Sequence, residues 1–467
     1  MRKMVKMFAT VSNFFENTSL HGFKFIGNRE IHWSERILWT IVCIVSWIGS
    51  GVLLYISYTA YQENAVRYGF ETYLTENTPL PSVSVCEDNN LEPLYRKANE
   101  LFGKEHDVNL DEVLRELTYF RGSAYYIKEF CNDRGIECPK RNFSELVRKV
   151  RSSCEEIFVN CFWSSFPFEC CQHFVPIETE LGTCFTLNKR NEMKLKAEGD
   201  MNWINTYANI YEEFPELTVA VNGSVVVYIH PEYDAPFLNT HAYNILRPDT
   251  DRHISAYISV IDIENPPEVR DLSIYQRKCR FPDENNLRSA GAYSYSACIV
   301  DCRRTAQMNL CNCTSHLTPN TRPEEHCNYD GIKCLDIHNS RLSVIKSKWT
   351  GNDGLECDCL PGCADIETEI VFSHFTNPKY LVVEPGSSLI SVKLLKFPYE
   401  RYKRNVVNGM IELFVSIGVT AGLFLGASLL SIVEVIYYFF FRACAKERKE
   451  SIDENESVTQ NILPFVL

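Results

Sequence analysis

The chain has 467 residues, of which 45% are hydrophobic and 23% are charged, and its formal net charge is -13. These fractions belong to a folded protein and exclude an intrinsically disordered or collagen-like chain, while the acidic balance argues against a nucleic-acid partner. Its 20 cysteines are too many for a reduced cytosolic enzyme, so they indicate either metal clusters or an oxidising compartment.

The first predicted element is a membrane-spanning helix over residues 37–61, a stretch without any charged residue. About 20 helical residues cross a bilayer, so this segment can span it with some tilt. A cleaved signal peptide is the alternative. It is disfavoured because residues 1–36 precede the stretch and because signal peptides have shorter apolar regions of ~7–15 residues.

Residues 62–408 are predicted to form one large acidic α+β domain. Apolar spacing predicts helices at 108–120 and 144–159, and β-like runs occur at 217–229, 255–263 and 388–396. Eighteen cysteines lie in this domain, an even number that suits a disulfide framework whose connectivity stays open. They are Cys86, Cys131, Cys138, Cys154, Cys161, Cys170, Cys171, Cys184, Cys279, Cys298, Cys302, Cys311, Cys313, Cys327, Cys334, Cys357, Cys359 and Cys363. Zinc is the alternative for them, but the usual finger spacing is absent, so we expect no metal site.

Three N-glycosylation sequons in the same domain favour an extracellular location, at Asn142, Asn222 and Asn312. The sequence contains no HExxH, no GxSxG and no glycine-rich phosphate loop. We therefore expect neither an enzyme nor a bound cofactor.

A second apolar segment, residues 409–441, is longer than one straight crossing needs and contains Glu412 and Glu434. A carboxylate within a membrane is costly unless it faces a wet or protein-lined space, so this helix is more than an anchor. Basic residues precede the first span and follow the second, at the start of the tail 442–467. The positive-inside rule then predicts a two-span protein with both termini in the cytoplasm. We expect it in the plasma membrane.

The second span also has the composition of a pore. Gly418, Gly422 and Gly426 recur every four residues on one helical face. Tight GxxxG packing is the alternative explanation. In Gly426, Ala427 and Ser428, however, the side chains are so small that backbone carbonyls could face an ion if the helix opens there. One chain supplies one such helix, so the pore requires an oligomer.

These features resemble the degenerin/epithelial sodium channel family, and most of all its insect pickpocket branch. The matching motifs run in family order along nearly the whole chain. They are SLHG at 19–22, PSVSVC at 81–86, CC at 170–171, TELGTCFTLN at 179–188, RKC at 277–279, YSYSAC at 293–298, CDCLPGC at 357–363 and GLFLGAS at 422–428.

The resemblance implies a homo- or heterotrimer in membrane lipid, with palm, finger, thumb, knuckle and β-ball regions. It also implies a voltage-independent, sodium-preferring, amiloride-sensitive current, with sodium as the permeant ion. Residues 426–428 would then form the selectivity filter, with Glu434, Gly422 and Gly418 lining the pore or its cation vestibule. His21 and Gly22 would belong to a re-entrant gating element, and Ser416 to the gate.

Three other classes share parts of this pattern. A two-pass scavenger-type lipid receptor has the same topology but gives no reason for Glu434 or the glycine ladder. An ATP-gated trimeric channel would need clustered basic residues in an ectodomain that is in fact acidic, and an ectoenzyme would need catalytic motifs. The sequence leaves the stimulus open among acid, salt, water, pheromone, peptide and force. It also leaves open whether the basic stretch 401–404 is a processing site.

Overall fold

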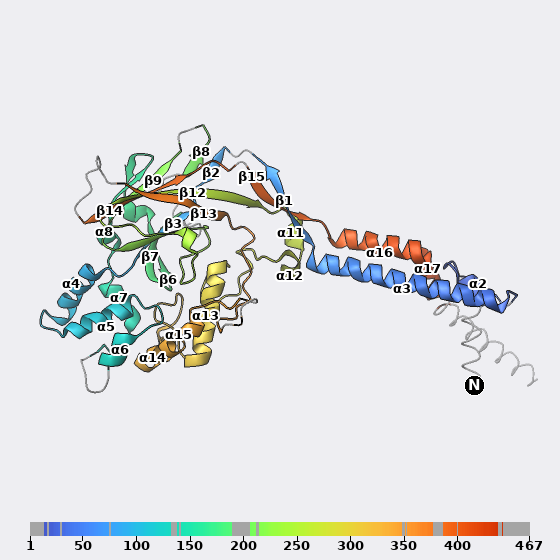
Figure 1. Ribbon diagram of the computed structural model, residues 1–467, viewed down its shortest axis with the longest axis horizontal. Coiled ribbons are helices and arrows are strands. Elements are labelled where there is room, and N and C mark those ends of the chain that lie inside the picture. The colour runs from blue at the N-terminus through green and yellow to red at the C-terminus, as the bar shows by residue number, and fades with distance from the viewer. Residues whose placement is uncertain are drawn as a thin grey trace, which may run out of the picture. The chain divides into compact units, whose positions relative to one another are not determined.

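The apolar β runs of the chain come together in one eight-stranded sheet and one five-stranded sheet in the computed structural model (Figure 1). The structure describes residues 14–15, 18–28, 30–73, 76–131, 138–139, 142–188, 206–211, 214–347, 351, 353–376, 386–398, 400–437 and 441. Contacts divide the chain into two units. The first contains residues 1–67, 268–277 and 406–467, and the second, here called the body, contains 68–267 and 278–405.

The large sheet of the body has the strand order β1-β15-β12-β14-β9-β4-β5, with β13 pairing to β12. Its strands are β1 (Val66–Thr72), β4 (Phe158–Trp163), β5 (Phe166–Phe168), β9 (Glu216–Asn222), β12 (His253–Glu264), β13 (Glu367–Thr376), β14 (Ser387–Leu394) and β15 (Glu400–Val406). The smaller sheet contains β3 (Ser82–Glu87), β6 (Val175–Thr179), β7 (Gly182–Leu187), β10 (Val225–His230) and β11 (Ile245–Leu246). A separate pair joins β2 (Asn77–Pro79) to β8 (Tyr207–Asn209).

Strand β10 shows why these sequences form sheets. Val225, Val227 and Ile229 point into a core shared with the large sheet, whereas Val226 and Tyr228 join a second cluster on the opposite face. Successive side chains of a strand alternate between faces, so a strand covered on both sides needs an unbroken apolar run. The predicted run 217–229 is therefore two strands, β9 and β10, placed in different sheets.

Two groups of helices complete the body. The first contains α4 (Leu91–Phe102), α5 (Val108–Thr118), α6 (Tyr125–Phe130) and α7 (Phe143–Val150). The second contains α13 (Tyr295–Cys311), α14 (Tyr329–Ile337) and α15 (Asn339–Leu342). Val113, Leu117 and Val147 share one buried cluster with Ile332 and Leu335, which joins the two groups. The shorter elements are α8 (Cys154–Ile157), α9 (Cys170–His173), η1 (Ala242–Asn244) and η2 (Pro323–Glu325).

The helix predicted over 144–159 is wrong beyond Val150. Arg151 leaves the helical conformation and its buried guanidinium donates to the carbonyls of Thr118, Leu181 and Thr183, at 2.9, 2.5 and 3.2 Å. Ser153 starts the short α8 with a capping box, after which the chain enters β4. Tertiary hydrogen bonds have overridden the helical periodicity here.

All eighteen cysteines named above form nine disulfides, which resolves the connectivity that the sequence left open. The pairs are Cys86–Cys184, Cys131–Cys138, Cys154–Cys171, Cys161–Cys170, Cys279–Cys363, Cys298–Cys359, Cys302–Cys357, Cys311–Cys334 and Cys313–Cys327. Cys298 and Cys302 lie one turn apart on α13, so their two bridges tie this helix to the segment that carries Cys357 and Cys359. Such cross-links stabilise thin helical projections mainly by restricting the unfolded chain.

The basic stretch 401–404 lies within β15 rather than in a loop. Arg401 pairs with Glu71 at 3.0 Å and with Glu264 at 2.6 Å. Arg404 is only 2% exposed and donates to Asn265 and to the carbonyl of Cys363. Cleavage at this stretch would require β15 to leave the sheet.

The other unit contains the apolar helices. They are α3 (Trp33–Glu63), α16 (Met410–Leu425) and α17 (Leu429–Ile436), accompanied by the short α2 (Phe23–Gly27), α11 (Glu268–Asp271) and α12 (Ile274–Arg277). Helix α3 is long and apolar enough to cross a membrane. Helices α16 and α17 satisfy the same criterion only if they are taken together, and they meet at a bend of 71°. The described residues do not include 1–13 or 442–467. Cys444 and most of the basic residues that flank the two predicted spans lie in these parts of the chain.

Candidate functional site

Helices α3 and α16 pack along each other (Figure 1). The hydroxyl oxygens of Ser57 on α3 and Ser416 on α16 lie 2.7 Å apart. A Cβ on Gly49 would lie 3.1 Å from the ring of Phe424, so the glycine makes room for that ring. Because polar groups in apolar helices find partners only where helices face each other, the serine pair marks the face of α16 that is turned to α3.

The second apolar segment breaks at residues 426–428, between α16 and α17. Gly426 has a φ of 59°, the left-handed conformation that glycine adopts at low cost and that commonly ends helices. Ser428 then caps α17, and its hydroxyl oxygen accepts from the amide of Ser431 at 3.3 Å. A helix-ending glycine beside a helix-capping serine explains why this long apolar run is not one straight helix.

A turn at His21 and Gly22 lies against this break. The backbone N–H of His21 donates to the carbonyl of Leu425 at 3.1 Å. That carbonyl belongs to the last turn of α16, where carbonyls lack intrahelical partners. A Cβ on Gly426 would collide with the His21 ring, and a Cβ on Gly22, whose φ is 86°, would collide with the sulfur of Cys43 on α3. The two glycines therefore allow the turn to contact both helices.

The same N-terminal segment also binds the carboxylate of Glu434. The Ser19 hydroxyl donates to Glu434 at 2.7 Å, and the Ser19 backbone N–H donates at 3.3 Å. The Ser19 oxygen also lies 2.9 Å from the hydroxyl of Ser431. Hydrogen bonds to an ionised group are among the stronger ones, and they lower the cost of a carboxylate in an apolar segment.

Gly418 and Gly422 on α16 have open space beside them in the described part of the chain. A Cβ placed on either glycine would have no other atom within 4 Å. Packing against α3 therefore does not account for Gly418 and Gly422. Within the described residues, the face that these two glycines form is open.

The structure brings some of the predicted site residues together and leaves others apart. His21, Gly22 and Gly426 meet at the break, and Glu434 joins them through Ser19. Ser416 lies elsewhere on α16, opposite Ser57.

Sequence reasoning assigned no role to three residues that complete the site, Ser19, Cys43 and Ser57. A signal was present for each of them. Ser19 lies within the SLHG motif, while Cys43 and Ser57 are small, weakly polar residues inside an otherwise apolar span. Cys43 is buried, and its sulfur lies 3.8 Å from the His21 carbonyl oxygen.

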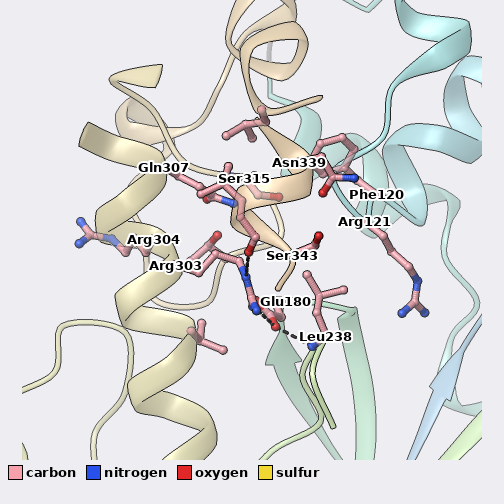
Figure 2. A pocket seen from close by; sticks show the side chains of 15 residues that line it. Phe120, Arg121, Glu180, Leu238, Arg303, Arg304, Gln307, Ser315, Asn339 and Ser343 are labelled. Atoms are coloured by element: carbon pink, nitrogen blue, oxygen red, sulfur yellow. Dashed lines mark hydrogen bonds and ion pairs between the residues drawn. The ribbon is translucent and has the colours of Figure 1, made fainter. Parts of the chain in front are cut away.

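The body contains a buried ion pair that also needs an explanation. Arg303 on α13 pairs with Glu180 between β6 and β7, and both side chains are nearly inaccessible to solvent (Figure 2). Arg303 Nε donates to the Leu342 carbonyl at 3.0 Å, and the Leu238 amide donates to Glu180 at 2.6 Å. The adjoining cavity is only about 30 Å³, which leaves no room for a substrate. We therefore interpret this cluster as a structural connection between α13 and the smaller sheet.

A disulfide-rich α+β body and apolar helices that are interrupted at three small residues are features expected of a membrane channel. No group of three or more His, Cys, Asp or Glu side chains that could hold a metal occurs in the described ranges. The comparison with known families is consistent with this class. The chain belongs to the amiloride-sensitive sodium channel family, whose model matches residues 14–438.

Individual relatives are similar in sequence to this chain along most of its length. The chain is 25% identical to the sodium channel protein Nach of Drosophila melanogaster, over 92% of this chain and 86% of that protein. It is 22% identical to pickpocket protein 28 of Drosophila melanogaster, over 94% and 79% of the two chains. It is also 22% identical to the bile acid-sensitive ion channel of Mus musculus, over 92% of this chain and 87% of that protein.

These findings confirm the degenerin/epithelial sodium channel resemblance and the expectation that the protein is not an enzyme. Members of the family are ion channels that form multimeric assemblies. The scavenger-type receptor, the ATP-gated channel and the ectoenzyme are therefore set aside.

Proposed function

We propose that this chain is the pore-forming subunit of a trimeric, voltage-independent, sodium-preferring and amiloride-sensitive cation channel of the plasma membrane. In this proposal α3 is the first span, α16 and α17 form one broken second span, and both termini are cytoplasmic. Residues 62–408 are extracellular, and a sensory stimulus acting on them opens the pore. The observation that carries the proposal is the break at 426–428 with the His21 turn bonded to it.

The break gives residues 426–428 the chemistry of a selectivity filter. Helix α16 ends there and α17 begins, so the carbonyls of Gly426 and Ala427 lie outside both helices. Three copies placed around an axis would form a narrow ring of carbonyl and hydroxyl oxygens. A ring of this kind replaces part of the hydration shell of a small cation, which is the usual basis of ion selectivity.

The face of α16 that carries Gly418 and Gly422 supports the placement of the pore axis. Both positions are open in this chain, and glycine lets neighbouring helices approach closely. Glu434 lies beyond the filter in sequence and contributes negative charge, which attracts cations to the pore. Its hydrogen bonds to Ser19 would hold that charge in place.

The nine disulfides and the exposed sequons support an extracellular body. Disulfides persist in oxidising compartments. Asn142, Asn222 and Asn312 are all exposed, so a glycan could attach to each without displacing packed side chains. The candidate stimuli are acid, salt, water, pheromone, peptide and force. The assembly is either a homomer or a heteromer.

The proposal is tested by expressing the chain alone and together with a related subunit, and by recording whole-cell current. We expect a current that reverses near the sodium equilibrium potential, shows no voltage-dependent activation and is blocked by amiloride. Solutions that vary in pH, osmolality and salt would identify the stimulus. A surface-expressed protein that conducts no cation in any combination would overturn the proposal.

A further inference from the structure

The sequon at Asn312 differs from the sequon at Asn222 in the accessibility of its hydroxyl residue. N-glycosylation requires the asparagine and also the Ser or Thr two positions further on, because the transferring enzyme binds both side chains. Asn312 is exposed where α13 ends, but its partner Thr314 is 0% exposed. In the other sequon both Asn222 and Ser224 are exposed. The folded chain therefore presents the sequon at Asn222 completely and the sequon at Asn312 only in part.

Hydrogen bonds hold Thr314 in its buried position. Its hydroxyl donates to the side-chain oxygen of Gln307 at 2.8 Å and lies 3.0 Å from the hydroxyl of Thr318. Its backbone N–H donates to the carbonyl of Glu325 at 2.8 Å, and its carbonyl accepts from the N–H of Cys327 at 2.9 Å. An enzyme that must bind this hydroxyl cannot reach it once the segment around Cys327 has packed onto Thr314.

Disulfides close the same region on both sides of Asn312. Cys313, the middle residue of the sequon, is bonded to Cys327, and Cys311 is bonded to Cys334. Both partners follow the sequon in the chain. Cys327 comes 14 residues after Cys313, so at ~5–20 residues per second it is synthesised about 1–3 s later. Disulfide formation takes seconds or longer, so Thr314 stays accessible for a limited time after its synthesis.

We propose that Asn312 is a glycosylation site that is used only while the Cys313–Cys327 bridge is open. In the step, Nδ2 of Asn312 forms a bond to the anomeric carbon of a lipid-diphosphate-linked oligosaccharide. The bond from that carbon to the diphosphate oxygen breaks, the lipid diphosphate leaves with the electron pair, and the nitrogen loses one proton. Because Asn312 is exposed, the finished glycan is compatible with the folded body.

Glycan occupancy at Asn312 therefore records how soon the segment 314–327 folds onto α13. A chain that closes this segment early escapes the modification, and a chain that closes it late carries the glycan. The inference rests on the extracellular placement of the body in the proposed function, since only then does the body meet the transferring enzyme.

The test measures glycan occupancy at each sequon of the full-length chain expressed in cultured animal cells. Total protein is collected, the glycans are removed enzymatically in heavy-oxygen water, and mass spectrometry then counts the asparagines that have become labelled aspartates. Synthesis proceeds with or without dithiothreitol, which keeps the cysteines reduced. We expect occupancy at Asn312 to be lower than at Asn222 in untreated cells. Dithiothreitol should raise it to the level of Asn222, whose own occupancy should not change.

Two cysteine variants locate the effect without a reductant. Cys327→Ser opens the bridge to Cys313 and leaves the Asn-Cys-Thr sequon intact, so occupancy at Asn312 should rise to its value in dithiothreitol. Cys154→Ser opens a bridge of similar span, 17 residues, elsewhere in the body and is the matched control. It should leave occupancy at Asn312 unchanged. Because occupancy is measured on total protein, a variant that fails to fold still gives a result.

The outcomes separate this inference from the proposed function. Glycan on Asn222, together with an occupancy at Asn312 that dithiothreitol does not change, would overturn the inference alone. So would an equal rise at Asn312 in the two cysteine variants. If none of the three sequons carries glycan, even in the reduced chain, the extracellular placement of the body is wrong, and the inference is overturned with it.

Discussion

The hydroxyl of Ser57 lies 2.7 Å from the hydroxyl of Ser416 and joins the two long apolar helices of the chain. The family resemblance placed Ser416 in the gate, and the structure identifies α3 as the surface that a bulkier side chain there would meet. Hydrogen bonds between helices in lipid contribute ~0.6 kcal/mol on average, whereas overpacking costs ~1–3 kcal/mol. Steric bulk should therefore have a larger effect than loss of the hydrogen bond.

We expect Ser416→Val to give a standing inward sodium current without stimulus, because the closed packing of α16 on α3 is strained and separation relieves it. Ser416→Ala and Ser57→Ala should each have a small effect, and the double alanine variant should add nothing, since both remove one bond. The measurement is resting current normalised to surface protein. Val415→Ala is the neighbouring control. A silent resting state in a surface-expressed Ser416→Val channel with normal stimulated current would place the gate elsewhere.

Gly22 is expected to affect opening through its contact with Cys43. Gly22→Ala puts a Cβ on a residue with φ of 86° and against the Cys43 sulfur. The left-handed conformation alone costs a non-glycine residue ~1–2 kcal/mol. Single-channel open probability should change in Gly22→Ala, and Cys43→Ala should partly restore it by removing the obstructing sulfur. No change in Gly22→Ala, or no restoration in the double variant, would show that this contact does not control opening.

Ser19 and Glu434 are expected to act as a pair. Ser19→Ala removes the hydroxyl that donates to the carboxylate, and Glu434→Gln removes the charge but leaves an acceptor. If the pair holds the N-terminal segment against α17, each variant should reduce single-channel conductance or open probability, and the double variant should be less than additive. The readout is a double-mutant cycle on both quantities. Fully additive effects would mean that the two residues act separately.

The body should lose stability as pH rises toward neutrality because of Asp365. Burial, followed by the charge of Asp234, raises the pKa of Asp365 from 3.8 to about 7. Asp365 therefore keeps its proton up to about pH 7 in the folded chain but releases it near pH 3.8 in the unfolded chain. The stability that Asp365 contributes is lost as pH rises from about 3.8 to about 7. His316 has the opposite sign, because burial lowers its pKa from 6.5 to about 4 and stability falls as pH decreases through that range.

Comparing the melting temperature of Asp365→Asn with that of the unchanged protein at each pH isolates the contribution of Asp365 to stability. Above pH 7 the variant should melt at a higher temperature, by about 2–4 °C per kcal/mol recovered. The difference should shrink toward pH 4. Asp353→Asn, at an exposed aspartate, is the control and should follow the unchanged protein. A pH-independent difference would show that Asp365 carries its charge throughout this range.

The sequence predicted the long apolar helix over 37–61 and the disulfide-rich α+β body, because each depends on local composition or spacing. It did not predict the end of α7, because Arg151 finds its carbonyl partners on elements that are distant in the sequence. The disulfide pairing was inaccessible for the same reason, as in the bridge between Cys279 and Cys363. Within the site, the roles of Ser19 and Ser57 appear only when segments far apart in the sequence are placed side by side.

The central claim is that residues 426–428 select the permeant ion while the His21 turn braces them. The most direct measurement is the ratio of sodium to potassium permeability, obtained from reversal potentials, for Gly426→Ala and Ser428→Cys. Gly426→Ala forces a Cβ into the His21 ring at a φ of 59°, so the ring of filter oxygens must shift. The matched control is Gly51→Ala on α3, where a Cβ meets open space. We expect both filter variants to lower the permeability ratio and the control to leave it unchanged. An unchanged ratio in both filter variants, with normal current, would contradict the account.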